Sequence, residues 1–173
     1  MKKILFPFVL LMILAMPLQA EQTRDPYQFF FHETFGDFSD ELETARQDGK
    51  SGVLLFFEMD DCPFCHWMKQ NVLNQVAVQE YYRDNFMMFS VDVEGDVEIV
   101  NFDGRNMSQK DFAFREHRVR ATPVLMFFDL EGNQVHRHTG RTSDPGEFLL
   151  MGKYVVDGVY KDMRFTRYKR EQE

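Results

Sequence analysis

The chemistry of this chain centres on Cys62 and Cys65, the only cysteines among its 173 residues. A single Cys-x-x-Cys pair supplies too few ligands for a four-coordinate structural metal site, and no third cysteine offers another disulfide partner. A purely structural disulfide across so short a loop would remove little entropy from the unfolded chain. The spacing therefore favours a pair that cycles between dithiol and disulfide.

The surrounding residues predict a strand followed by a helix. Residues 52–58 form an apolar run rich in strand formers, and residues 59–61 form a short loop. Pro63 suits a first helical turn, where the missing N–H would be unpaired in any case. Apolar residues then recur at helical spacing: Phe64, Met68, Val72 and Val76.

Cys62 is thus expected at a helix N-terminus, where free N–H groups and the helix dipole stabilise an anion. In such settings the pKa of a cysteine falls from about 8.5 to about 3.5–7.5. We predict that Cys62 is the exposed, attacking thiol and that Cys65 is the less accessible thiol that resolves the mixed disulfide. Asp60 and Asp61 oppose this effect, because nearby carboxylates disfavour a thiolate.

Residues 1–20 have the pattern of a secretory signal peptide. Lys2 and Lys3 precede the apolar stretch 4–16, and Ala20 is a small residue suited to cleavage. The apolar stretch is shorter than the roughly 20 residues of a membrane span. We therefore favour a cleaved signal over an uncleaved anchor and expect a periplasmic protein of a bacterial envelope.

Length and charge indicate one acidic globular domain. The net charge is −8, and loss of Lys2 and Lys3 leaves 18 basic against 28 acidic residues. Such a surface makes nucleic acid an unfavourable partner. We expect an N-terminal extension over 21–37, a domain over 38–160, and a charged tail over 161–173 that frays.

Strands and helices alternate along the domain. Residues 29–31, all phenylalanine, are either a first strand or a staple that packs the N-terminus onto the core. The expected helices are 38–48, 75–85, 108–117 and one from Ser143 or Asp144 towards Val159, and the expected strands are 86–93, 124–128 and 134–138, with a small hairpin within 95–104. Continuously apolar strands imply a sheet covered on both faces, and so a mixed α/β sandwich.

This ordered set resembles the thioredoxin fold over about residues 38–159. The features that carry the resemblance are a strand, Cys62-Pro63-Phe64-Cys65 at a helix start, Thr122-Pro123 opening a later strand, and a closing hairpin and helix. The chain is most similar to SoxW-type periplasmic thioredoxins, through residues 55–58, 91–96, 102–104, 127–133 and 154–160. The resemblance implies a central mixed β-sheet flanked by helices, with a small hairpin insertion.

The resemblance also implies residue roles. Cys62 matches the nucleophile, Cys65 the resolving cysteine, and the two form a redox-active disulfide that needs no cofactor. Pro63 and Phe64 influence its potential. Pro123 matches a proline with a cis peptide bond, which is rare in proteins, and Thr122 would lie beside the sulfurs and pair with a bound substrate strand. The alternative for Pro123 is an ordinary proline at a strand start.

The chain departs from the family at one position. Thioredoxins carry a buried acid where this sequence has Phe56. Glu58 lies on the same strand face, two residues closer to the motif. Two interpretations stay open: Glu58 mediates proton transfer to Cys65, or it is a solvated carboxylate at the strand end. Trp67 follows the second cysteine and is expected to pack.

The implied activity is reduction of disulfides in envelope proteins, with a membrane thiol transporter of the DsbD/CcdA type as electron donor. The sequence does not fix the redox potential, so a disulfide oxidant of the same fold is an alternative. An isomerase would need a dimerisation module, for which the chain has no room.

Three further alternatives come from other classes. Cys62 to His66 matches the Cys-x-x-Cys-His pattern of c-type haem attachment, although strands flank the motif. His136 and His138 share a strand face and suggest a metal site, although no third ligand is evident. A binding protein with an inert disulfide is the last alternative.

Overall fold

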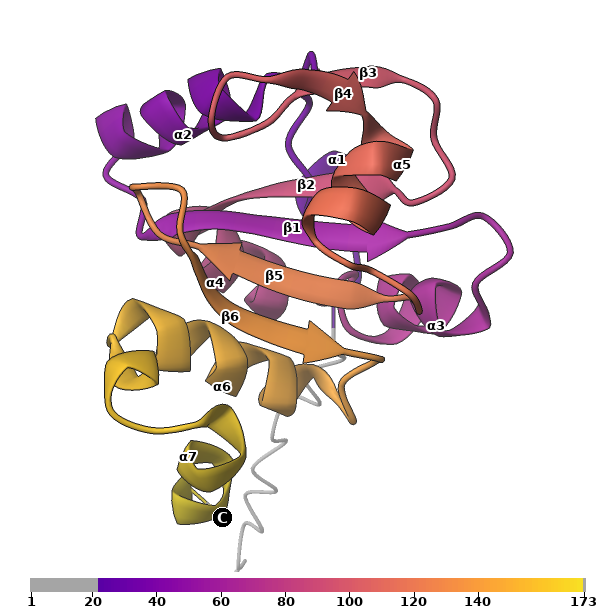
Figure 1. The fold of residues 1–173 in the computed structure, drawn as a ribbon. Helices are drawn as coiled ribbons and strands as arrows, with labels where there is room; N and C mark the ends of the chain where they lie inside the picture. The colour runs from indigo at the N-terminus through magenta and orange to yellow at the C-terminus, as the bar shows by residue number, and fades with distance from the viewer. Residues whose placement is uncertain (1–21, 173) are drawn as a thin grey trace, which may run out of the picture.

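A computed structural model describes residues 22–172, so the predicted signal peptide lies outside the described residues. The centre is a four-stranded sheet in the order β2-β1-β5-β6 (Figure 1). Its strands are β1 (Gly52–Glu58), β2 (Phe86–Asp92), β5 (Val124–Phe128) and β6 (Gln134–Thr139). β1 pairs in parallel with β2 and antiparallel with β5, which pairs antiparallel with β6. The predicted mixed sheet is confirmed.

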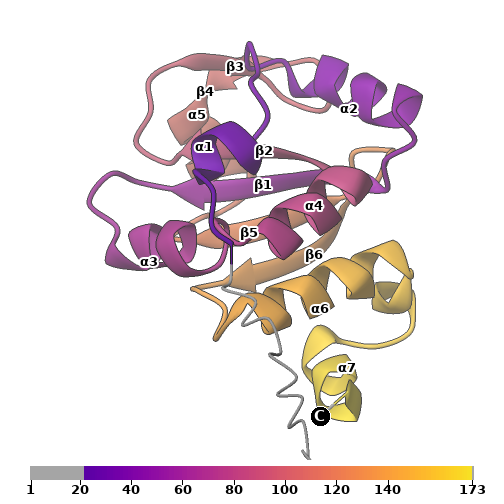
Figure 2. The same ribbon diagram turned by 180° about the vertical axis from the view of Figure 1, so that it is seen from behind.

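Helices cover both faces of this sheet (Figures 1 and 2). On one face lie α3 (Pro63–Asn71), α4 (Val76–Asn85) and α6 (Pro145–Val156). On the other lie α2 (Phe38–Gln47), the short α5 (Gln109–Asp111) with a π-helical turn (Phe112–Glu116), and the hairpin β3 (Glu98–Val100) and β4 (Asn106–Ser108). The predicted hairpin is confirmed, although its second strand lies beyond residue 104.

Helices can cover both faces of the sheet because β1 and β5 are largely apolar and are buried along their whole length. Alternate residues of each strand point to opposite faces. Leu54 and Phe56 enter the core beneath α3, α4 and α6, whereas Leu55 and Phe57 enter the core beneath α2 and the π-helical turn. The predicted two-sided burial is confirmed.

The N-terminal segment packs onto the first of these cores. The short helix α1 (Pro26–Phe29) begins after Asp25, whose carboxylate accepts a hydrogen bond from the Tyr27 N–H. Phe30 and Phe31 are buried, and the Phe31 ring lies 5.8 Å from the Phe56 ring, centroid to centroid. Phe30 and Phe31 are therefore a packing staple, whereas Phe29 is 39% exposed, and a first strand is wrong.

The C-terminal residues form a helix, contrary to the expectation that they fray. α7 (Phe165–Gln172) packs against α6 through Phe165, which is 6% exposed. The Phe165 ring lies 5.4 Å from the Tyr154 ring, and Lys169 pairs with Glu147 at 2.8 Å. One buried ring anchors a segment whose overall composition is charged. Among residues 22–172, the structure has no helix long and apolar enough to cross a membrane.

His136 belongs to this same contact. Its ring lies 5.2 Å from Tyr154 and 5.5 Å from Phe165, and burial lowers its pKa to about 4. His138 instead faces the Arg141 carbonyl, 3.4 Å from its Nε2. No group of three potential metal ligands occurs within residues 22–172. His136 thus has a packing role between β6 and α7.

Replacing Phe165 with alanine should lower the free energy of unfolding by about 3 kcal/mol, the low end for a buried phenylalanine. Chemical denaturation of purified protein measures the change. Thr166→Ala is the matched control, because Thr166 is exposed and next in sequence, and its effect should stay within about 0.5 kcal/mol. Equal midpoints for Phe165→Ala and wild type would show that α7 is not anchored by this ring.

Stability should also fall with acid between pH about 6.5 and 4. Burial lowers the pKa of His32, His117 and His136 to about 4 in the folded protein. The unfolded chain therefore binds more protons in this window, so the free energy of unfolding decreases as pH falls, by at most about 1.4 kcal/mol per pH unit for each histidine. Denaturation of wild type and His136→Phe across this range tests this. The variant should show a shallower slope, and identical slopes would contradict the assignment of His136.

Candidate active site

Cys62 and Cys65 lie where β1 leads into α3. Cys62 is the residue immediately before the first turn of α3, with Pro63 at the first helical position. The two cysteines form a disulfide with their Cα atoms 5.2 Å apart. The Cys65 backbone N–H donates a hydrogen bond to Cys62 Sγ at 3.1 Å. The predicted strand-to-helix junction is confirmed, and the helix start directs a donor at the Cys62 sulfur.

The accessibility of the sulfurs differs from the prediction. Cys62 is 3% exposed and Cys65 is fully buried, so both are buried in the disulfide form and Cys62 is not exposed there. The reason is that Cys62 turns inward to bond Cys65 and joins the core beneath α3. Phe64, the first residue of the predicted helical spacing, is 56% exposed, whereas Met68, four residues later, is fully buried. That spacing spans two helices, because α3 ends at Asn71 and α4 begins at Val76.

The peptide bond between Thr122 and Pro123 is cis, as predicted. Pro123 directly precedes β5, and the first residue of β5, Val124, pairs with Phe57 on β1. The bond therefore lies at the end of the sheet where β1 leads to Cys62. Thr122 is partly exposed there, and its pairing with a substrate strand stays a prediction.

Glu58 is not solvated, so that interpretation is wrong. It is 8% exposed, and its carboxylate accepts hydrogen bonds from Lys69 Nζ at 2.6 Å and from the Ser90 hydroxyl. Lys69 on α3 is itself 9% exposed. These are the only two charged side chains classed as buried within residues 22–172. A buried ion pair thus occupies the space beside α3.

Lys69 also contacts the N-terminal segment. Its ammonium donates a hydrogen bond to the Tyr27 hydroxyl at 2.5 Å. Burial lowers the pKa of Lys69, but hydrogen bonds to Glu58 and Tyr27 outweigh burial and raise it above the usual value. The ammonium is therefore charged at neutral pH.

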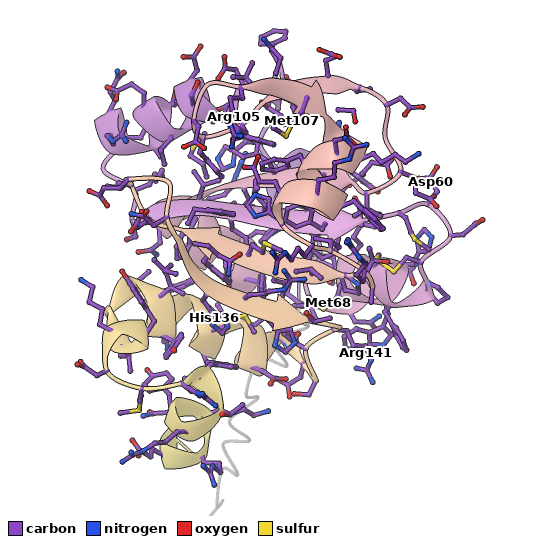
Figure 3. All side chains as sticks on the ribbon, viewed as in Figure 1. Asp60, Met68, Arg105, Met107, His136 and Arg141 are labelled. Carbon is purple, nitrogen blue, oxygen red and sulfur yellow. A yellow bond between two sulfur atoms is a disulfide. The ribbon has the colours of Figure 1, made fainter. Side chains whose placement is uncertain are left out.

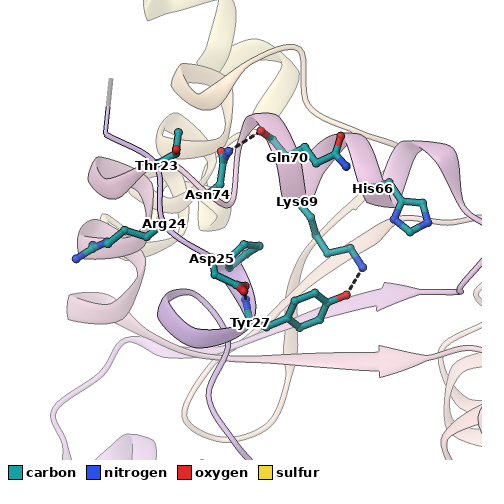
Figure 4. A pocket seen from close by; sticks show the side chains of 9 residues that line it. Thr23, Arg24, Asp25, Tyr27, His66, Lys69, Gln70 and Asn74 are labelled. Atoms are coloured by element: carbon teal, nitrogen blue, oxygen red, sulfur yellow. Dashed lines mark hydrogen bonds between the residues drawn. The ribbon is translucent and has the colours of Figure 1, made fainter. Parts of the chain in front are cut away.

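A groove of about 600 Å³ opens between α3 and the N-terminal segment (Figure 4). Tyr27 and Lys69 lie toward one another, and His66, which directly follows Cys65 in sequence, lies at one end of the groove. The ring nitrogen Nε2 of His66 lies 2.8 Å from the Asp60 carbonyl. Since a carbonyl only accepts, Nε2 must carry the proton. His66 therefore connects α3 to the loop before Cys62, a contact that the sequence did not indicate.

The loop after β6 contacts the same helix (Figure 3). The Arg141 guanidinium lies 4.2 Å above the centroid of the Trp67 ring, and the Thr142 backbone N–H lies 3.4 Å from Met68 Sδ. Trp67 is partly buried and packs, as predicted. Arg141 and Thr142 carry no motif, so sequence analysis missed their proximity to the active-site helix.

The comparisons with known proteins agree with this geometry. The thioredoxin-like domain family matches residues 38–155. Among solved structures, a thioredoxin-fold protein from Helicobacter pylori is 20% identical, with a TM-score of 0.62 over 71% of this chain and 84% of that one. DsbH oxidoreductase is 22% identical, with a TM-score of 0.55 over 79% and 91%. The C-terminal domain of DsbD from Neisseria meningitidis, in its reduced form, is 16% identical, with a TM-score of 0.50 over 67% and 91%.

No curated protein matches the chain as a sequence relative. The family match nevertheless spans most of the domain, from the start of α2 almost to the end of α6. It includes both cysteines and the cis-proline. This chain belongs to the thioredoxin-like domain family.

Proposed function

We propose that this protein is a periplasmic thiol–disulfide oxidoreductase that reduces disulfides in envelope proteins. One observation carries the proposal: the only two cysteines form a disulfide at the N-terminus of α3, with a backbone N–H directed at Cys62 Sγ. On reduction, the same donor and the helix dipole stabilise a thiolate at Cys62. We therefore propose that this disulfide cycles between its oxidised and reduced forms.

The reaction transfers two electrons from the enzyme to its substrate. The Cys62 thiolate attacks one sulfur of a substrate disulfide, that bond breaks, and the departing sulfur takes up a proton. Cys65 then loses its proton and attacks Cys62 Sγ. The mixed disulfide breaks, the second substrate sulfur leaves as a thiolate, and the enzyme disulfide re-forms.

Other active-site residues take supporting roles in this proposal. Thr122, held by the cis bond to Pro123, pairs through its backbone with the substrate strand. Pro63 starts α3, and the exposed Phe64 contacts the substrate beside Cys62.

The oxidised enzyme must then be reduced again. We propose a membrane thiol transporter of the DsbD/CcdA type as donor and the periplasm as the compartment, on the signal-like residues 1–20. Within the family we place the chain with SoxW-type thioredoxins, on the segments quoted above. The shared fold with DsbH and the DsbD C-terminal domain supports a Dsb-type partnership.

The cysteine variants test the mechanism. Cys62→Ser should abolish reduction of insulin disulfides with dithiothreitol as electron source, because it removes the nucleophile. Cys65→Ser, reduced and then freed of dithiothreitol, should accumulate mixed disulfides with insulin, visible by mass spectrometry, because the protein has no second thiol to resolve them. Full activity in Cys62→Ser would refute the assignment of the nucleophile, and an inactive wild type would indicate a binding protein with an inert disulfide.

The direction of electron flow follows from the redox equilibrium with glutathione. A potential near the roughly −270 mV of thioredoxin would support a reductase, whereas one near about −120 mV would make the protein a disulfide donor. Visible absorbance of purified protein tests the haem alternative in the same sample.

The Glu58–Lys69 pair is positioned to tune this potential. Lys69 follows Cys65 by four residues on α3, so their Cβ atoms lie about 6 Å apart on one helix face. A cation there stabilises a thiolate, and Glu58 neutralises that cation. Thioredoxins carry a buried acid where this chain has Phe56. In our proposal the Glu58–Lys69 pair takes over the role of that acid.

Opposite shifts in potential should follow when each partner is neutralised. Glu58→Gln removes the carboxylate that neutralises Lys69 and should raise the potential by about 30–50 mV, and Lys69→Met should lower it by a similar amount, if the charge acts on the thiolate over about 7 Å at an effective dielectric constant near 20. The double variant should return near the wild-type value, and denaturation checks that each variant folds, since breaking a buried pair costs about 3–5 kcal/mol. Shifts of the same sign in both single variants would argue for a merely structural pair.

A further inference from the structure

Two exposed arginines near the active site lie against aromatic rings. The guanidinium carbon of Arg141 is 4.2 Å from the Trp67 ring centroid, and that of Arg120 is 3.4 Å from the Phe114 ring centroid. Both arginines are exposed. Within residues 22–172, neither has a carboxylate partner in an ion pair.

The strand directions bring both arginines to the end of the sheet that carries the disulfide. β1 and β6 run in the same direction, since each is antiparallel to β5. Cys62 follows the end of β1, Arg141 follows the end of β6, and Arg120 shortly precedes the start of β5. Figure 3 shows Arg141 beside Met68 of α3 at this end of the sheet.

Arg141 borders the exposed side of the cysteine motif. Trp67 follows Pro63 by four residues and Phe64 by three, so these three side chains share a face of α3. The guanidinium lies over the Trp67 ring and donates a hydrogen bond to the Thr142 carbonyl, and the Thr142 N–H contacts Met68 Sδ, so the loop is fixed to α3. A molecule that covers Phe64 on its way to Cys62 would therefore meet the Arg141 guanidinium.

A stacked guanidinium suits a carboxylate. Its planar donors match the two carboxylate oxygens, it is weakly hydrated, and the ring beneath it reduces the freedom lost on binding. We propose that Arg141, assisted by Arg120, selects disulfide substrates that carry acidic side chains next to the reactive cysteine. This inference rests on the proposed function and names its substrate class.

The acidic loops on the other side restrict where those side chains lie. Asp60 and Asp61 follow β1, and Glu94 and Asp96 follow β2, all exposed and without ion-pair partners in the described part of the chain. A substrate carboxylate on that side would be repelled. The selection therefore depends on which side of the substrate cysteine is acidic.

Three short peptides, each with its cysteine in a disulfide, test the proposal. The first has two glutamates before the cysteine, the second has two glutamates after it, and the third has glutamines at both places. The rate of oxidation of the reduced protein by each peptide is followed through the fluorescence of Trp67, the only tryptophan. Each rate is divided by the rate of that peptide with dithiothreitol, which removes differences in intrinsic reactivity. One glutamate peptide, not both, should react about fivefold faster than the glutamine peptide, the upper range for an exposed ion pair.

The variants assign this preference to Arg141. Arg141→Gln should reduce the ratio to near one, and Arg141→Lys should keep part of it. Arg164→Gln makes the same charge change on an exposed arginine just before α7, away from the disulfide, and should keep the full ratio. Equal rates for all three peptides, or an unchanged ratio in Arg141→Gln, would overturn the inference alone. A wild-type protein that reacts with none of them would overturn the proposed function.

Discussion

The burial of β1 on both faces is the constraint on which the rest of the structure depends. A strand covered on both sides has no place for a charge along its length, and all seven of its residues are buried. Glu58, the last of them, is accommodated at the strand end because Lys69 reaches it from α3 and donates a hydrogen bond to its carboxylate. The loop that follows leads at once to Cys62, so the strand also fixes where the disulfide lies. The position of the sulfurs and the position of the buried ion pair thus have one cause.

The N-terminal segment completes this arrangement. Phe31 covers Phe56, the position at which thioredoxins carry an acid, and Tyr27 covers Lys69. An apolar residue at position 56 is therefore part of a changed packing, in which an aromatic ring from outside the matched domain fills the space above the strand. The acidic side chain beside the active-site helix is Glu58, which lies two residues after Phe56 at the end of β1. The N-terminal segment, the Glu58–Lys69 ion pair and Phe56 thus contact one another through Phe31 and Tyr27, and each depends on these contacts.

Local patterns predicted most of the fold, and long-range contacts account for what they missed. The strand and helix order, the two-sided sheet and the cis-proline follow from apolar runs, Pro63, and the resemblance to thioredoxins. The partner of Glu58 could not be predicted, because Lys69 resembles any exposed lysine of a helix in sequence. The same holds for α7, where a single aromatic ring in a charged stretch decides between a frayed tail and a docked helix. The inward turn of Cys62 depends on the disulfide itself.

The charges around the disulfide show how a small acidic domain can still discriminate. Its net charge opposes acidic partners at long range, where charges sum. Within a few ångströms of the sulfurs the individual groups dominate, because screening over about 8 Å at physiological salt removes most of the distant field. At the end of the sheet that carries the disulfide, carboxylates follow β1 and β2, whereas Arg120 and Arg141 lie by β5 and β6. Aromatic rings and backbone carbonyls hold both guanidinium groups in place without neutralising them, so their charge remains available to a bound substrate. The active site can therefore prefer an acidic substrate although the net negative charge of the protein repels acidic molecules.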